Sequence, residues 1–275
     1  QAVVSATGQD SGLSTTDDSD DPNNGSNVDP NMDNNPDDPN RIRFPHISLA
    51  KQTVGSPVPA SSGLPGNFDV VYDLTITNTG STPLNNLTLV EDLQTHFGGA
   101  FVRIVPQVGQ PSVLQASSAT DLPGILGSFD GTAANAQIFD GSPSLINVNE
   151  FVAVRILVEI DPDNGTAIYD SVSSDGNHDL ENRAVTTGED STNPGVTISD
   201  TSDDPADGTE TDPNGDNDPD DPTVVSLPDI EVTKQVTAGP IAIAGTGNVE
   251  VIYTLTVTNT GAERLTNLTM TENLF

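Results

Sequence analysis

The sequence predicts an all-β protein made of antiparallel β-sandwich repeats in tandem, and three observations lead to this prediction. Apolar residues alternate with polar ones, most regularly at Val152, Val154, Ile156, Val158 and Ile160, and alternation of period two is typical of half-buried strands. Thr, Val, Asn, Asp, Pro and Gly are frequent, and all are poor helix formers, so we expect no convincing helix. Finally, a long segment of the chain recurs near its end, which indicates repeats.

The first part of the chain predicts strands that are separated by polar turns. Residues 2–4 and 12–15 are strand-like. Clear alternation over 47–51 and 70–77 predicts two further strands. The tripeptide Asn78-Thr79-Gly80 predicts a turn, because Asn and Gly accept left-handed backbone conformations. Since Leu84, Leu87 and Leu89 follow it, we expect a hairpin here.

The middle of the chain is less regular. Weak strands are predicted over 101–105, 125–129 and 137–139, between Gly, Ser and Pro residues. The strongest strand, 152–160, ends in a turn at 161–165. Strands over 180–187 and 196–198 then complete the domain, and this series of short strands indicates an antiparallel sandwich.

The internal repeat sets the domain organisation. Ile230 to Gln235 matches Ile47 to Gln52, 183 residues earlier, and 251–274 matches 70–93 at a separation of 181. We therefore predict that 1–43 is the end of a preceding repeat with an acidic belt, and that 44–226 is one complete repeat, with a sandwich over 44–198 and a second belt over 199–226. Residues 227–275 would be the first half of the next repeat in a tandem array.

The two acidic belts carry oxygen ligands at every second residue, a spacing suited to calcium. In the second belt these are Asp212, Asn214, Asp216, Asp218 and Asp220, and in the first they are Asp29, Asn31, Asp33, Asn35 and Asp37. Calcium takes about six to eight oxygen ligands, so carboxylates at alternate positions around a glycine can wrap the ion. The bidentate Glu of a helix-flanked calcium loop is absent, which argues against that motif.

Three more acidic sets are candidate calcium ligands. They are Asp200, Asp203 and Asp204 in the second belt, Asp17, Asp20 and Asp21 in the first, and Asp175, Asn177 and Asp179 in a separate loop. The alternative is a soluble linker without metal, which the composition alone permits. The register kept in both belts favours calcium. For the separate loop a solvated turn is favoured.

Charge restricts the partners. The formal net charge is −33, with eight Lys and Arg in 275 residues, so nucleic acid and anionic membrane surfaces are not expected to bind. Acidity, strand-rich composition and a belt that needs the millimolar calcium found outside cells favour an extracellular, cell-surface location. No membrane span or signal peptide is visible. Because the sequence starts without Met and stops inside a predicted domain, we expect a window from a longer chain.

Several motifs together resemble a known repeat. VVYDLTITNTG and VIYTLTVTNTG, each after a Lys-bearing strand (ISLAKQ, IEVTKQ), are similar to the conserved repeat domain, of unknown function, found in giant bacterial surface and adhesin proteins. The closing ENRAVTTG and the acidic belts resemble the same proteins. The resemblance implies an immunoglobulin-like sandwich repeated along a cell-surface fibre or adhesin, with acidic calcium-binding segments between repeats.

Catalysis has little support in the sequence. His46, His96 and His178 lie in separate segments, there is no Cys, and no nucleophile-base set is visible, so we expect no enzyme. Glu91 and Asp92 are interpreted as surface charges, and Tyr72 and Tyr253 as core residues. Lys51, Asn182 and an acid such as Glu91 are the residue types of the Lys–Asn isopeptide cross-links of surface adhesins. The favoured interpretation is an exposed Lys and a hydrogen-bonded Asn.

The predicted function is structural. We expect a repeat of a long extracellular filament or adhesin stalk, stiffened by Ca²⁺ in the belts, whose partners are neighbouring repeats and, through regions outside this sequence, glycans or other cells. The alternative is a sandwich that binds glycan or protein, although aromatic residues make up only 4% and Trp is absent, while sugar-binding faces use exposed rings. A third option is an acidic matrix that templates mineral.

Overall fold

The computed structural model describes residues 2–21, 41–106, 112–116, 122–162, 180–208, 212, 219–261 and 263–273. The chain divides into two compact units, Gln1–Phe44 and Pro45–Phe275. The smaller unit is a hairpin in which β1 (Val3–Thr7) pairs antiparallel with β2 (Ser14–Asp18). This confirms the strand-like character of its two short segments.

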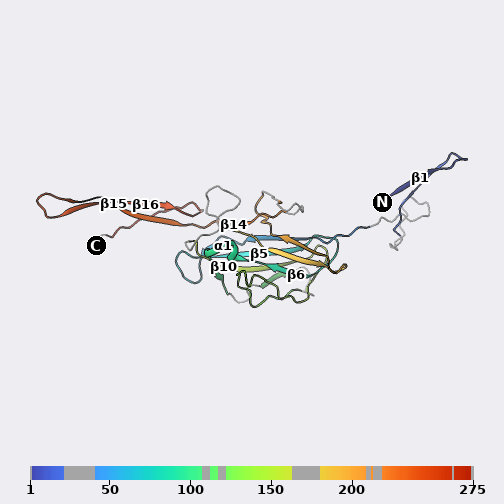
Figure 1. Cartoon of the computed structure of the whole chain (residues 1–275), viewed down its shortest axis with the longest axis horizontal. Coiled ribbons are helices and arrows are strands. Elements are labelled where there is room, and N and C mark those ends of the chain that lie inside the picture. The colour runs from blue at the N-terminus through green and yellow to red at the C-terminus, as the bar shows by residue number, and fades with distance from the viewer. Residues whose placement is uncertain are drawn as a thin grey trace. The chain divides into compact units, whose positions relative to one another are not determined.

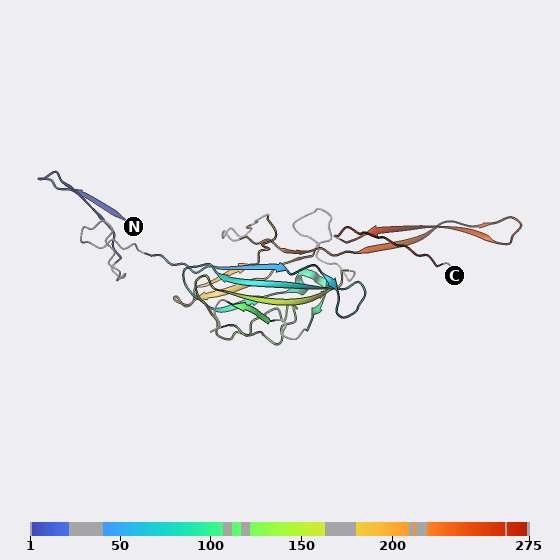
Figure 2. The same ribbon diagram turned by 180° about the vertical axis from the view of Figure 1, so that it is seen from behind.

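Two antiparallel sheets, of six and four strands, build the sandwich of the larger unit (Figures 1 and 2). The first has the order β3 (Ile47–Thr53), β5 (Phe68–Asn78), β10 (Phe151–Ile160) and β7 (Phe101–Ile104). Two short strands extend it, β4 (Val58–Pro59) on β5 and β8 (Ser112–Ala116) on β10. The long alternating runs of the sequence therefore form the centre of this sheet.

The second sheet has the order β13 (Thr197–Thr201), β12 (Val185–Asp190), β6 (Leu84–Val90) and β9 (Leu145–Ile146). Beside these sheets, β11 (Leu180–Asn182) pairs with β14 (Thr223–Val225). The predicted sandwich boundary at 198 thus falls inside β13, and the end of the second belt returns to the sandwich as β14.

One hydrophobic core joins the elements of the sandwich. Inward positions of β5, such as Leu74 and Ile76, are 0% exposed, and so are Leu84 and Leu89 of β6. All four belong to one buried cluster. Burial of alternate residues from two sheets is the arrangement of a β-sandwich, so the predicted all-β, sandwich-like fold is confirmed.

Two local predictions are wrong. The turn after Asn78 does not close a hairpin, because β5 and β6 lie in different sheets. The buried Asn78 amide donates to the carbonyl oxygens of Thr82 (2.9 Å) and Ile146 (3.1 Å), which fixes the crossover between the sheets. A short helix, α1 (Leu93–Phe97), is also present, followed by the 3₁₀ turn η1 (Gly98–Ala100). The Asp92 carboxylate accepts from Thr95 N and caps α1.

The weak strands of the middle region are only partly present. Phe101 to Ile104 forms β7, whereas 125–129 and 137–139 contribute isolated bridges, Ile125 with Phe139 and Val90 with Gln137. Gly and Pro interrupt these segments, so the ladder cannot propagate.

The last described segment is a long hairpin of β15 (Ile230–Ala242) and β16 (Val249–Asn259). It repeats the sequence of β3 and β5. Val232 is 62% exposed, whereas its counterpart Leu49 is 0% exposed. No helix within the described residues is long and apolar enough to cross a membrane.

Candidate functional site

Most of the predicted calcium ligands lie outside the described residues. These are Asp29, Asn31, Asp33, Asn35, Asp37, Asp175, Asn177, Asp179, Asn214, Asp216 and Asp218. The calcium prediction for their segments therefore stays a prediction.

The described residues of the second belt are part of the sandwich edge. Asp200 lies in β13, is 4% exposed and accepts a hydrogen bond from Leu49 N at 2.5 Å. The backbone of Asp203 bonds to both Leu49 and Lys51 of β3. Asp220 is 3% exposed, whereas Asp212 is exposed. Asp200 and Asp203 thus help to fix β3 in place, a role that the spacing of the acids in the sequence did not reveal.

Negative charge is concentrated around Asp204. Its amide bonds to Asp221 O at 3.1 Å. Burial raises the pKa of Asp204, and the charges of Asp207 and Asp221 raise it further, although a hydrogen bond from Ala206 opposes them. Among the described residues, no group of three or more acidic or histidine side chains is arranged to hold a metal ion.

The described acids of the first belt lie at the end of the small hairpin. Asp17 is in β2, opposite Val4. Asp17 and Asp21 are half-buried and Asp20 is exposed.

A second cluster lies in the core of the sandwich, and its centre is an ion pair. Lys51 of β3 and Glu91, just after β6, are joined by a contact of 2.5 Å between Nζ and Oε2, and both side chains are 0% exposed. Lys51 Nζ also lies 4.8 Å from the centre of the Tyr72 ring on β5, close enough for a cation–π interaction. The expectations of an exposed lysine and of a surface Glu91 are therefore wrong.

Asn182 of β11 completes the cluster. It is 0% exposed and pairs in register with Thr223 of β14, whose hydroxyl donates to Lys51 O at 2.8 Å. Burial and the charge of Glu91 raise the pKa of the Tyr72 hydroxyl well above its ordinary range, while the adjacent Asn182 side chain partly offsets them. Asn182 is thus next to Tyr72 and, through Thr223, next to Lys51.

The cluster is rich in polar atoms that lack a partner. Among the described residues, Glu91 Oε1, the Tyr72 hydroxyl and both amide atoms of Asn182 are buried without a hydrogen bond of good geometry. Each such atom costs about 1–3 kcal/mol, and buried polar atoms are otherwise nearly always paired. Four of them around one lysine therefore need an explanation.

Electrostatics makes the Lys51 ammonium easier to deprotonate than an exposed lysine. Burial lowers the pKa of Lys51, and the charge and hydrogen bond of Glu91 oppose that effect only in part. His96 of α1 is half-buried nearby. Burial lowers its pKa, the charge of Glu91 opposes this, and the charge of Lys51 adds to it. The cluster thus holds a nucleophilic amine, a carboxyl group and a carboxamide in a water-poor interior.

The sequence carried a signal for this cluster. Lys51 continues the inward series Ile47 and Leu49, and Glu91 continues Leu87 and Leu89. Strand periodicity places such residues in the core. The general preference of charged residues for water suggested the opposite, and here periodicity decides.

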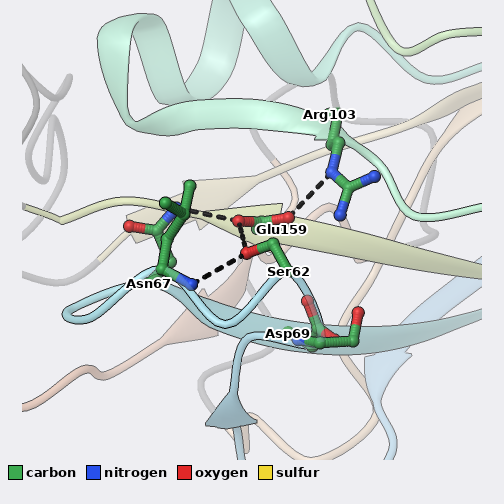
Figure 3. A network of polar contacts seen from close by, with 7 residues as sticks. Ser62, Asn67, Asp69, Arg103 and Glu159 are labelled. Atoms are coloured by element: carbon green, nitrogen blue, oxygen red, sulfur yellow. Dashed lines mark hydrogen bonds and ion pairs between the residues drawn. The ribbon is translucent and has the colours of Figure 1, made fainter.

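A second buried carboxylate lies elsewhere in the same unit (Figure 3). Glu159 of β10 is 0% exposed and accepts from Ser62 Oγ (2.6 Å), Asn67 Nδ2 (2.9 Å) and Arg103 Nε (2.8 Å). Burial acts to raise the pKa of Glu159, but the three hydrogen bonds and the charge of Arg103 lower it overall. This network ties the segment before β5 to the sheet.

Comparisons with known proteins give no family. No protein-family model matches the chain, and no curated protein matches it. Two solved structures of a GH20 exo-β-N-acetylglucosaminidase from Vibrio harveyi are similar to parts of it. An inactive mutant gives a TM-score of 0.27 at 15% identity over 72% of this chain and 21% of the enzyme. The complex with N-acetylglucosamine gives a TM-score of 0.25 at 14% identity, over 57% of this chain and 17% of the enzyme. The chain thus spans about a fifth of the enzyme's length.

Proposed function

We propose that the chain is a structural segment of a long extracellular surface fibre or adhesin stalk, built from tandem sandwiches and stiffened by Ca²⁺ in the acidic belts. Its partners would be neighbouring repeats of the same chain or filament. No turnover of a substrate is part of this function.

The observation that carries the proposal is a set of contacts made twice. Lys234 pairs with Glu272 at 2.8 Å and lies 4.4 Å from the Tyr253 ring, as Lys51 does with Glu91 and Tyr72. Repeated side-chain contacts support a repeated fold, because each copy specifies the same local packing.

The turn after each long strand is repeated as well. Asn259 donates to Glu263 O at 2.9 Å, as Asn78 does to Thr82 O at 2.9 Å. Asn86 and Asn267 both adopt a left-handed conformation, with φ of 51° and 56°. A turn hydrogen bond and a left-handed asparagine at matching positions of both copies support two repeats in series.

Crowded acids support the calcium part of the proposal. Burial raises the pKa of Asp204, and the charges of Asp207 and Asp221 add to that effect, so three acids lie close together where the second belt leaves the sandwich. A divalent cation would relieve this repulsion. The ligands would come from the alternating residues of each belt.

The test compares the 275-residue chain in about 1 mM calcium, which is in the extracellular range, with the same chain in EDTA. We expect small-angle scattering to show an extended, rigid chain with calcium and a broader distribution of dimensions after chelation, with a lower melting temperature. The double variant Asp216→Asn, Asp218→Asn should behave in calcium like the wild type in EDTA. Glu250→Gln, an exposed change on β16, is the matched control. Identical scattering and melting in both buffers would contradict the calcium role.

A further inference from the structure

We propose that the sandwich forms an internal isopeptide bond between Lys51 Nζ and Asn182 Cγ, with Glu91 transferring the proton. This covalent modification site is independent of calcium and of the fibre role. It joins the first strand of the sandwich, β3, to one of its last, β11.

The placement of the three residues supports this bond. Lys51 and Glu91 are in direct contact at 2.5 Å, and Tyr72 touches both sides of the cluster, with its ring under Lys51 Nζ and its hydroxyl beside Asn182. Thr223 links the same two strands from the other side, since it pairs with Asn182 and donates to Lys51 O. Amine and carboxamide are therefore held around one aromatic ring.

The unpaired atoms identify which groups can react. Glu91 uses Oε2 for Lys51, and its Oε1 has no hydrogen-bond partner among the described residues. Neither Oδ1 nor Nδ2 of Asn182 has one within that set. The Asn182 carboxamide and one oxygen of Glu91 are therefore both buried with unused hydrogen-bonding capacity. A purely structural core would pair these groups or replace them with apolar ones.

The chemistry balances without any further reactant. A proton moves from the Lys51 ammonium to Glu91, which leaves a neutral amine and a carboxylic acid. The amine lone pair attacks Asn182 Cγ while Glu91 protonates the carboxamide oxygen, and Glu91 then carries the second amine proton to Nδ2. The Cγ–Nδ2 bond breaks and ammonia leaves. The proton on the former carboxamide oxygen returns through Glu91 to the ammonia, so a neutral secondary amide, an ammonium ion and the Glu91 carboxylate remain. No oxidant or reductant takes part.

The environment favours each step. Burial lowers the pKa of Lys51, which makes transfer of its proton to Glu91 easier and so favours the nucleophilic amine. Fixed neighbours replace the chance encounter of two groups in solution. Exclusion of water also removes a nucleophile that would compete with the amine for Asn182 Cγ.

The second copy provides an internal control. Lys234 and Glu272 repeat the pair, but their side chains are 36% and 35% exposed. The water-poor setting of Lys51 is thus not repeated at Lys234, and we expect no bond there.

The first test is the intact mass of the folded chain. We expect it to be lower than the sequence mass by one ammonia, about 17 Da. Cyclisation of Gln1 or a succinimide at Asn182 would give the same loss, so the site must be located by digestion. Trypsin cannot cut after an acylated lysine, so the product is peptide 44–103 joined to 156–183.

The variants separate the roles. Lys51→Arg keeps the positive charge and removes the nucleophile, and Asn182→Ala removes the electrophile. Both should abolish the joined peptide. Glu91→Gln keeps the shape and should reduce its formation at least tenfold, a loss expected for a proton-transfer group. Lys234→Arg should leave the joined peptide unchanged.

Three results would overturn the proposal. The first is a folded wild-type chain whose digest contains free peptide 44–51 and unmodified peptide 156–183. The second is a mass loss that is confined to peptide 156–183 or to peptide 1–41. The third is a joined peptide that still forms in Lys51→Arg. Circular dichroism of each variant shows whether it is folded. The wild-type digest decides the question even where a variant does not fold.

Discussion

Glu91 and Glu159 are both fully buried beside a cation, yet they differ in how completely their oxygens are bonded. Three donors from two segments, the loop before β5 and strand β7, satisfy Glu159, whereas Glu91 bonds to Lys51 and leaves Oε1 without a hydrogen bond among the described residues. The cation of Glu159 is also half in solvent, with Arg103 42% exposed, while Lys51 is 0% exposed. The complete hydrogen-bond network of Glu159 stabilises the fold, whereas the incomplete network of Glu91 around a buried amine supports the proposed reaction of Lys51.

The largest effect is expected at Glu91. Glu91→Ala should prevent the cross-link. In the Asn182→Ala background, where Lys51 stays an amine, the same change leaves that amine buried without a counter-charge and should lower the free energy of unfolding by about 3–5 kcal/mol. Guanidinium denaturation of the sandwich measures this. A loss below about 1 kcal/mol, the range of a surface pair, would mean that Lys51 and Glu91 do not interact as buried charges.

Glu159→Gln should have a smaller effect. The neutral amide keeps the shape of Glu159 but weakens three hydrogen bonds that end on a charged carboxylate in the wild type. We therefore expect the free energy of unfolding to fall by about 1.5–3 kcal/mol. Hydrogen exchange should rise in the segment 60–67, which the network holds. Exchange that increases evenly over the sandwich would instead indicate global destabilisation, and Glu250→Gln serves as the silent control.

Glu159 should also make stability depend on pH. Its pKa in the folded state is lowered, so its contribution is full above the unfolded value of about 4.3 and is lost as the pH falls through the folded value. The stability difference between wild type and Glu159→Gln should therefore shrink between pH 5 and pH 3, approximate limits set by these values. Denaturation at several pH values measures it, and a constant difference would contradict the assignment.

The smallest effects are expected at the exposed partners. Arg103→Gln should cost less than about 1 kcal/mol, because half-exposed ion pairs contribute little and Ser62 and Asn67 still donate to Glu159. Lys234→Arg should change stability by less than about 0.5 kcal/mol, since its pair with Glu272 is open to solvent. Thermal melting of both variants beside the wild type checks the order, and a larger effect at Lys234 than at Glu159 would reverse the comparison.

The sequence predicted the strands well because alternation is a local signal. The long strands β5 and β10 followed from periodicity alone, and the repeat of β3 and β5 in β15 and β16 followed from the matching sequences. It could not predict that β5 and β6 belong to different sheets, because the hydrogen bond of Asn78 to Ile146 O joins residues far apart in the chain.

The candidate site was only partly predictable for the same reason. The residue types Lys51, Glu91 and Asn182 were visible, and their inward register could have been read from the neighbouring apolar residues. Their meeting around Tyr72 depends on the pairing of β11 with β14, which no local pattern specifies. Conversely, the spacing of Asp200 and Asp203 suggested a metal, whereas both also bond to β3.

The bond between Thr223 and Lys51 has a mechanical meaning. It joins the strand by which the chain enters the sandwich to the strand by which it leaves, so tension on a fibre would load this junction first. A Lys51–Asn182 amide would carry that load through a covalent bond. The residues between them, about 130, would then be shielded from stretching, which withholds roughly 430–470 Å of extended chain from each such domain under force.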